Sequence, residues 1–441
     1  MTDATQYARW FRDSTPYISA HRHKTFVVLL GGDAIVHDNI TPIVHDLALL
    51  SVLGVRVVLV HGARPQIDAA LAAARLESRF YGHRRITDDA SIDQIQFAVG
   101  RVRTQVEGLF SMGLPSTPLH NTRIHVLSGN LVTAKPVGII DGVDHLHTGR
   151  VRRIQRDLIH RLLDERTIVL LSPLGYSPSG EAFNLSSEEL ATEVAISLGA
   201  DKLIMFDARD KVLDADGQPC SELTPAQLDS LLDSTSRLDD SSRLRLGELL
   251  RACRAGVPRC HLISYLEDGA LLRELYTASG AGTQISDHGL QAIRGATSED
   301  VAAIVELIRP LETAGVLVKR PRDRLEQEIH RFFVAELDGI VIGCCALYPY
   351  PEGNTAEFAC LATHPGYREA TGADNIGNLL LRRAETEARR QGLGSLFLLT
   401  TQARDWFREN GFADAGVDEL PAPRKSLYNL QRNSKIMIKR L

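Results

Sequence analysis

A loop of small residues that leads into an amphipathic helix is the part of this 441-residue chain that most directly suggests ligand chemistry. The loop follows Arg368 and holds Gly372, Ala373 and Gly377, and the apolar positions after it recur at helical spacing. A helix N-terminus presents unpaired backbone N–H groups and the positive end of the helix dipole, so this junction suits a phosphate or pyrophosphate. Glycines would also fit an ordinary turn between a strand and a helix, so whether the loop binds an anion has to be inferred from the elements around it.

Those elements form a regular order of strand, loop, helix, strand and short helix. Residues 357–363 are an apolar run closed by His364-Pro365-Gly366, which predicts a buried strand ending in a turn. Apolar residues from Ile376 to Ala388 predict a helix, and residues 395–400 predict a second strand. Residues 406–412 predict a short helix that ends at Gly411.

This order, with Trp406-Phe407 and Gly411-Phe412 in the short helix, resembles the GNAT acetyltransferases. The resemblance implies that acetyl-CoA is the co-substrate, that the first strand pairs through its backbone with the pantetheine arm, and that the loop holds the pyrophosphate. The acetyl-CoA-binding residues implied in this way are Cys360, Leu361, Ala362, Thr363, Arg368, Gly372, Ala373, Gly377 and Asn378. The segment from Arg368 to Gly377 is several residues longer than the family pattern, and Ile376 stands where a basic residue is common.

The composition is that of a globular protein with more than one domain. It is 44% hydrophobic and 24% charged, and its formal net charge of -5 argues against nucleic acid or an anionic membrane as the main partner. The six cysteines include no CxxC pair, so we expect neither a disulfide framework nor a metal site. No apolar run approaches ~18 residues and the start of the chain lacks a signal-peptide pattern, so we expect a soluble, cytoplasmic protein.

The longer first part of the chain alternates predicted strands and helices. Strands are predicted at 26–33, 55–60, 167–171, 202–206 and 259–264, helices at 40–53, 65–76, 90–112, 186–198, 240–255 and 267–277, and a loop at 172–184. This alternation predicts an α/β domain with a mostly parallel sheet flanked by helices.

This part resembles the amino-acid kinase fold, in its N-acetylglutamate kinase branch. The matching segments are Leu30-Gly31-Gly32, His61-Gly62, Phe183-Asn184-Leu185-Ser186, Leu198-Gly199-Ala200-Asp201 and Gly282-Thr283. Active kinases of that branch carry a lysine where this chain has Leu29, and their second phosphate loop, His-Gly-Gly-Gly, reads His61-Gly62-Ala63-Arg64 here. Without the lysine, nothing at this loop balances the charge on a transferring phosphoryl group. We therefore expect a domain kept for binding and assembly.

The alternation lapses between Ser286 and Ala296, after which Thr297 begins a helix with an acidic first turn. We therefore expect an N-terminal helix for oligomerisation at 1–20, an amino-acid-kinase-like domain at 21–285, a linker at 286–294 and a GNAT domain of α+β fold at 295–441.

The two domains together, with the closing segment Tyr428-Asn429-Leu430-Gln431-Arg432-Asn433-Ser434-Lys435, resemble the bacterial amino-acid N-acetyltransferase family that makes N-acetylglutamate. That resemblance implies acetyl transfer from acetyl-CoA to the α-amine of L-glutamate, the first step of arginine biosynthesis, with feedback inhibition by L-arginine. It also implies a homo-oligomer, a hexamer, in which the N-terminal helix links subunits.

The implied reaction needs a base, because the α-amine of an amino acid is mostly protonated at neutral pH. Glu357, at the head of the cofactor-binding strand, is our candidate, although a surface acid at a strand end would look the same. The leaving thiolate needs a proton or a hydrogen bond, and Thr400 matches the family position, with Thr401 as the alternative. A threonine there is equally suited to capping the next helix.

The two carboxylates of glutamate require guanidinium or ammonium partners. The candidates are Lys319, Arg320, Arg432 and Ser434, although a basic run such as 319–324 is also typical of a solvated surface. For L-arginine the resemblance implies His261, Glu274 and Gly282, where Glu274 would receive the cationic groups. A surface acid and an ordinary turn are the alternative for these positions.

Two other functions stay open at this point. The chain could be an N-acetylglutamate kinase with an appended acetyltransferase, against which Leu29 and Ala63-Arg64 speak. It could also be a catalytically silent arginine sensor, which the long segment 368–377 favours if it blocks the pyrophosphate site.

Overall fold

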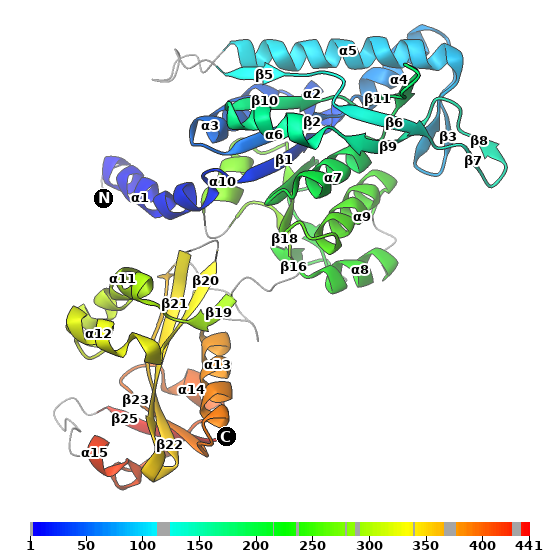
Figure 1. Cartoon of the computed structure of the whole chain (residues 1–441). Helices are drawn as coiled ribbons and strands as arrows, with labels where there is room; N and C mark the ends of the chain where they lie inside the picture. The colour runs from blue at the N-terminus through cyan, green and yellow to red at the C-terminus, as the bar shows by residue number, and fades with distance from the viewer. Residues whose placement is uncertain are drawn as a thin grey trace. The chain divides into compact units, whose positions relative to one another are not determined.

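The computed structural model describes residues 3–112, 124–214, 216–234, 238–277, 280–286, 292–337, 340–365, 376–425 and 434–441. The chain divides into two compact units, residues 1–288 and residues 289–441 (Figure 1). Each unit has its own sheet and its own cores.

The first unit is built on an eight-stranded sheet in the order β16-β18-β17-β13-β1-β2-β10-β5 (Figure 1). All neighbouring pairs are parallel except β17 with β18. The mostly parallel sheet predicted from the sequence is therefore confirmed. Its strands are β1 (Thr25–Leu30), β2 (Arg56–His61), β5 (His125–Leu127), β10 (Thr167–Leu171), β13 (Lys202–Asp207), β16 (Glu222–Leu223), β17 (Arg259–Ser264) and β18 (Thr283–Ile285).

Helices cover both faces of this sheet because its central strands are apolar on both faces. Phe26, Val28 and Leu30 of β1 join one core, with α3 (Ile40–Val52), α4 (Arg64–Ala73), α5 (Asp89–Ser111) and α10 (Ala270–Tyr276). Val27 and Leu29 join the opposite core, with α6 (Arg156–Asp164), α7 (Ser187–Leu198), α8 (Pro225–Ser234) and α9 (Asp240–Arg254). The short α2 (Gly32–Val36) follows β1, and α1 (Asp3–His21) contacts α10 through His21, whose Nε2 lies 2.9 Å from the carbonyl oxygen of Leu275.

A second, four-stranded sheet was not predicted. It has the order β12-β11-β6-β9, with β6 (Val132–Pro136), β9 (Gly149–Ile154), β11 (Leu174–Tyr176) and β12 (Ala182–Asn184). The predicted loop at 172–184 is therefore wrong in part, because it contains β11 and β12. Strands of three residues are too short to show an alternating pattern. Three two-stranded ribbons complete the unit: β3 (Arg79–Tyr81) with β4 (Arg84–Ile86), β7 (Ile139–Ile140) with β8 (Val143–Asp144), and β14 (Val212–Leu213) with β15 (Pro219–Cys220).

The second unit has a seven-stranded sheet in the order β19-β20-β21-β22-β23-β25-β24. Only β22 and β23 run parallel to each other. The strands are β19 (Ala292–Gly295), β20 (Phe332–Leu337), β21 (Ile340–Tyr350), β22 (Thr355–Thr363), β23 (Ser395–Thr400), β24 (Ala413–Ala415) and β25 (Lys435–Arg440).

The helices of this unit pack on opposite faces of the sheet. Cys344 and Ala346 of β21 share a core with α11 (Val301–Thr313) and α12 (Arg322–Glu328). Cys345 and Leu347 share the other core with α13 (Ile376–Arg390). Two short helices, α14 (Arg404–Glu409) and α15 (Ala422–Lys425), complete the unit. Within the described ranges of both units, no helix is long and apolar enough to cross a membrane.

Candidate functional site

A β-bulge interrupts β22 in the middle of the predicted cofactor-binding strand. Cys344 of β21 pairs with Ala362 and Ala346 pairs with Ala359, so two residues of β22, Cys360 and Leu361, stand opposite one residue of β21. Cys360 has a left-handed backbone with a φ of 52°. As a result, Cys360 and Ala362 face the core of α11 and α12.

Beyond Glu357, β22 and β23 are no longer paired. Their parallel ladder ends where Glu357 pairs with Phe397, yet β22 continues to Thr363 and β23 to Thr400, and no further pairing joins them in the described residues. Backbone N–H and C=O groups of β22 on this side can therefore pair with an extended ligand.

The start of α13 lies beside the end of β22. Gly343, which pairs with Thr363, lies directly under this helix, because a Cβ atom on Gly343 would be 2.7 Å from Cγ2 of Ile376. Gly377 and Asn378 are in the first turn of α13, whose N–H groups suit an anion. Arg368, Gly372 and Ala373 lie outside the described residues.

Glu357 is held by an arginine that the sequence did not single out. Arg424 of α15 donates from Nε to Oε2 over 2.7 Å and from Nη2 to Oε1 over 3.0 Å. The Glu357 residue is only 8% exposed, so this bidentate pair is shielded from water. The two residues are 67 positions apart, so no local pattern could have revealed their contact.

The Arg320 guanidinium interacts electrostatically with the same carboxylate, whereas Lys319 is exposed. The Arg320 backbone N–H donates to Oε1 of Glu312 over 2.8 Å, and its guanidinium interacts with Tyr348, Cys360 and Glu357. Arg320 is thus a predicted glutamate-binding residue that interacts with Glu357.

Two further side chains near this cluster are kept in their neutral forms. Tyr348 stands opposite Glu357 on β21 and donates its hydroxyl to Oε2 of Glu328 over 2.7 Å. Burial, together with Cys360 and this hydrogen bond, raises the pKa of Tyr348. Burial also raises the pKa of Cys360 to about 11, although Arg320 opposes the shift. Cys360 is therefore a thiol at neutral pH and a poor nucleophile.

Thr400 ends β23 and pairs with Lys435 of β25. Its hydroxyl oxygen accepts from the backbone N–H groups of Gln402 and Ala403 over 3.4 and 3.2 Å. Both contacts use the oxygen as an acceptor, so the hydroxyl proton can be donated elsewhere. Thr401 is exposed, Ser434 is buried directly before β25, and Arg432 lies outside the described residues.

The glycine-rich loops of the first unit are in direct contact with each other. A Cβ atom on Gly62 would be 2.8 Å from the backbone N of Gly32, and one on Gly32 would be 2.9 Å from the backbone N of Arg64. Leu29 is fully buried in an apolar core. His61 lies 2.8 Å from the Ser172 hydroxyl, and burial lowers its pKa to about 4, so its imidazole is neutral.

One cation comes close to the first of these loops, although the sequence did not single it out. Arg245 of α9 approaches Gly31, with Nη2 3.5 Å from where a Cβ atom on Gly31 would be. However, Nη1 of Arg245 donates to Asp207 over 2.5 Å and Nε is 3.9 Å from Oε1 of Glu188. The charge of Arg245 is therefore already compensated by two carboxylates.

The three predicted arginine-binding residues lie together. Nδ1 of His261 is 2.7 Å from Oε1 of Glu274, while Oε2 of Glu274 accepts from the N–H groups of Ala281 and Gly282 over 2.7 and 2.8 Å. Burial alone would raise the pKa of Glu274, but His261 and the two N–H groups lower it to about 2. Gly282 leaves no room for a side chain, because a Cβ atom would be 2.1 Å from the Leu262 carbonyl oxygen.

Comparison with known families and structures agrees with this two-part organisation. Residues 24–264 match the amino acid kinase family, and residues 328–414 match the acetyltransferase (GNAT) domain. Amino-acid acetyltransferases from Pseudomonas putida and Azotobacter vinelandii are 52% and 51% identical over 439 residues, covering 99% of this chain and of each relative.

Solved structures over the whole length are also similar. N-acetylglutamate synthase from Neisseria gonorrhoeae, complexed with coenzyme A and L-arginine, is 35% identical with a TM-score of 0.87, covering 99% of both chains. The same enzyme complexed with coenzyme A and N-acetyl-glutamate gives a TM-score of 0.63 at the same identity and coverage. This chain and its relatives thus share an amino-acid-kinase unit followed by a GNAT acetyltransferase unit. The chain belongs to the amino-acid acetyltransferase family.

Proposed function

We propose that this acyltransferase moves the acetyl group of acetyl-CoA to the α-amine of L-glutamate. The observation that carries the proposal is the separation of β22 from β23 directly after Glu357, beside Arg320 and Arg424. This arrangement supplies a strand edge for the pantetheine arm, a carboxylate next to its thioester end and guanidinium groups for a dicarboxylate. The Neisseria gonorrhoeae enzyme, with its bound coenzyme A, supports the same assignment.

In the proposed reaction, Glu357 takes a proton from the α-ammonium group of glutamate, directly or through one water. The freed amine then attacks the thioester carbonyl and forms the new C–N bond. Collapse of the tetrahedral intermediate breaks the C–S bond. Thr400 donates its hydroxyl proton to the leaving thiolate and regains a proton from the nitrogen, which becomes the amide N–H, while Glu357 releases its proton to solvent. In this proposal Cys360, Leu361, Ala362 and Thr363 hold the pantetheine arm, while the residues before and within the first turn of α13 hold the pyrophosphate.

The pairing of Glu357 with Arg424 adds a condition to these reaction steps. Both carboxylate oxygens of Glu357 are already occupied by hydrogen bonds from Arg424. A carboxylate of the substrate is a suitable replacement partner for Arg424, so we propose that glutamate binding releases Glu357 to act as base. Arg320, Arg432, Lys319 and Ser434 complete the glutamate site in this proposal.

We further propose that L-arginine inhibits the enzyme by binding near His261, Glu274 and Gly282. For inhibition to follow, arginine has to bind one arrangement of the chain better than another. A homohexamer in the cytoplasm, with α1 between subunits, is part of the same proposal and is tested by light scattering of the full chain and of a variant lacking residues 1–20.

The decisive experiment follows thiol release from acetyl-CoA with L-glutamate, with and without L-arginine. We expect release that depends on glutamate and falls when arginine is added. ATP with N-acetylglutamate should give no phosphorylated product. Thiol release without glutamate, or none at all, would exclude the proposed acetyl transfer, and phosphorylation would establish the kinase instead.

A further inference from the structure

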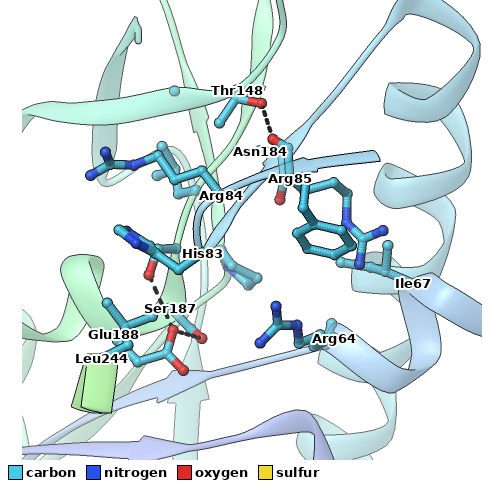
Figure 2. A pocket seen from close by; sticks show the side chains of 16 residues that line it. Arg64, Ile67, His83, Arg84, Arg85, Thr148, Asn184, Ser187, Glu188 and Leu244 are labelled. Carbon is cyan, nitrogen blue, oxygen red and sulfur yellow. Dashed lines mark hydrogen bonds between the residues drawn. The ribbon is translucent and has the colours of Figure 1, made fainter. Parts of the chain in front are cut away.

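Arg320, a proposed glutamate-binding residue of the second unit, has no ion pair of its own. Its Nη1 donates to the carbonyl oxygen of Val318 over 3.3 Å, and among the described residues no carboxylate oxygen is in ion-pair contact with its guanidinium. Figure 2 shows a pocket of the first unit where the arrangement is different, because Arg85, which lines it, forms an ion pair with Asp68 over 2.6 Å. The charge of Arg320 is therefore available for a carboxylate of the substrate.

The loop that carries Arg320 is closed by a contact across eight residues. Glu312 lies in the last turn of α11, and its Oε1 accepts from the backbone N–H of Arg320 over 2.8 Å. The helix ends directly after Glu312, where Gly315 has a φ of 73° and the backbone N–H of Val316 donates to the Leu311 carbonyl oxygen over 2.8 Å. The Glu312 side chain thus fixes the position of the backbone at Arg320.

The position of Glu312 is unfavourable for the helix itself. Unpaired carbonyl groups give the C-terminal end of a helix a partial negative charge, which repels an acidic side chain in the last turn. A half-buried residue that departs from the preference of its own helix indicates a demand from another part of the structure. The hydrogen bond to the Arg320 backbone is the contact that answers this demand.

Tyr348 supports the guanidinium end of the same arginine. Its hydroxyl donates to Oε2 of Glu328 over 2.7 Å, so the hydroxyl oxygen remains an acceptor, and it interacts with the Arg320 guanidinium. The guanidinium carbon of Arg331 lies 5.2 Å from the centre of the Tyr348 ring and helps to hold that ring in place. Tyr348 stands opposite Glu357 on the neighbouring strand, so this support lies next to the proposed base.

We propose that Glu312 is a positioning residue for glutamate, because its hydrogen bond to the Arg320 backbone holds the guanidinium where a carboxylate of the substrate can bind. This inference rests on the proposed function, acetyl transfer to glutamate. Glu312 takes no part in bond making or proton transfer. Its loss should therefore weaken the binding of glutamate and leave the chemical step and the binding of acetyl-CoA largely unchanged.

The test measures kcat and the KM values for glutamate and acetyl-CoA by thiol release, with the full chain. The variants are Glu312→Ala, Glu312→Gln, Arg320→Ala and the double variant Glu312→Ala with Arg320→Ala. Glu306→Ala is the matched control, because Glu306 is an exposed acid on the same helix. Thermal unfolding of each variant is recorded as well, so that a loss of stability is distinguished from a loss of glutamate binding.

We expect Glu312→Ala to raise the KM for glutamate roughly fivefold or more, while kcat and the KM for acetyl-CoA change by less than about twofold. Glu312→Gln should resemble wild type, because its amide oxygen can accept the same hydrogen bond. Glu306→Ala should also resemble wild type. In the Arg320→Ala background, Glu312→Ala should raise the KM for glutamate by less than about twofold, since the guanidinium that it positions is absent.

Three results would overturn the proposal: an unchanged KM for glutamate in Glu312→Ala, equal losses in Glu312→Ala and Glu312→Gln, or additive effects of Glu312→Ala and Arg320→Ala. If wild type releases no thiol with glutamate, the proposed acetyl transfer fails as well, whereas an active wild type with an unaffected Glu312→Ala variant removes only the role of Glu312. If Glu312→Ala does not fold, Glu312→Asp replaces it. Its carboxylate is one methylene shorter, so the KM for glutamate should rise there too, and an unchanged KM would contradict the proposal.

Discussion

Arg424 and Glu357 form a two-point contact in which Nε and Nη2 of the guanidinium each donate to one oxygen of the carboxylate, over 2.7 and 3.0 Å. The contact joins a four-residue helix near the C-terminus to the strand that carries the proposed base. It makes Glu357 part of an ion pair before any substrate arrives, and it leads directly to two predictions.

Replacing the proposed base should remove most of the activity. In Glu357→Gln the amide cannot take the proton of the α-ammonium group, so the maximal rate of thiol release should fall by a factor of roughly 100 or more. The KM for acetyl-CoA should stay within about threefold if cofactor and base sites are separate, as expected for the loss of a transition-state interaction. Glu352→Gln, in the exposed turn before β22, is the matched control. A fully active Glu357→Gln would remove Glu357 from the mechanism.

Arg424→Ala tests whether the arginine exchanges Glu357 for the substrate. We expect kcat/KM for glutamate to fall roughly 10- to 100-fold, because a charged hydrogen-bonding partner of the substrate is lost. Arg424→Lys should recover only part of this loss, since an ammonium group cannot make the two-point contact. Arg389→Ala on α13 provides the control. A higher activity of Arg424→Ala would mean that Arg424 only restrains Glu357.

Thr400 and Thr401 can be separated by paired substitutions. Thr400→Ala should lower the rate of thiol release roughly 10-fold or more, because the leaving thiolate loses its proton donor. Thr400→Ser keeps the hydroxyl and should have a rate close to that of wild type. The same result is expected if Thr400 only stabilises the turn at 400–403. The rate is therefore compared with the unfolding midpoint of each variant. A Thr401→Ala variant with the larger loss would transfer the assignment to Thr401.

The hydrogen bonds that Glu274 makes with His261, Ala281 and Gly282 predict how the stability of the first unit changes in acid. Its folded pKa of about 2 lies below its unfolded value of about 4.5, so the carboxylate stabilises the fold above about pH 4.5. That contribution, on the order of 3 kcal/mol, is lost as the pH falls from 4.5 towards 2. Urea unfolding at several pH values should show Glu274→Gln less stable than wild type at pH 7, with the difference shrinking in acid. Glu165→Gln, at an exposed acid of the same unit, should show no such difference. A difference that is independent of pH would contradict the assignment.

Replacement by alanine is expected to have opposite effects on stability at two glycines of the first unit. Gly282→Ala places a methyl group on the Leu262 carbonyl oxygen, so the backbone has to move and the unfolding midpoint should fall markedly. Gly247→Ala lies inside α9 with open space around it, and alanine should stabilise that helix by roughly 0.5–1 kcal/mol. Thermal unfolding of both variants checks the pair. Equal effects would mean that the tight contact at Gly282 can relax.

The features that could be predicted from the sequence were those determined by one continuous segment of the chain. Strands such as β1 and β10 are apolar on both faces, and α13 repeats its apolar residues at helical spacing, so their place in the fold follows from local pattern. The loss of the kinase lysine at Leu29 was likewise visible at one position.

The features that could not be predicted depend on contacts between distant residues. Arg245 reaches Gly31 from α9, and Arg424 reaches Glu357 from α15, and neither arginine differs locally from its exposed neighbours. The bulge at Cys360 has no glycine to mark it, although its left-handed backbone costs roughly 1–2 kcal/mol. That the bulge directs Cys360 towards Arg320 could be found only from the fold.

The direct contact between the two glycine-rich loops has a mechanical consequence. The backbone of Arg64 rests against Gly32 with no space for even a methyl group between them. A movement of the Arg64 backbone towards Gly32 therefore has to displace Gly32 as well, so the end of β1 and the start of α4 are mechanically coupled.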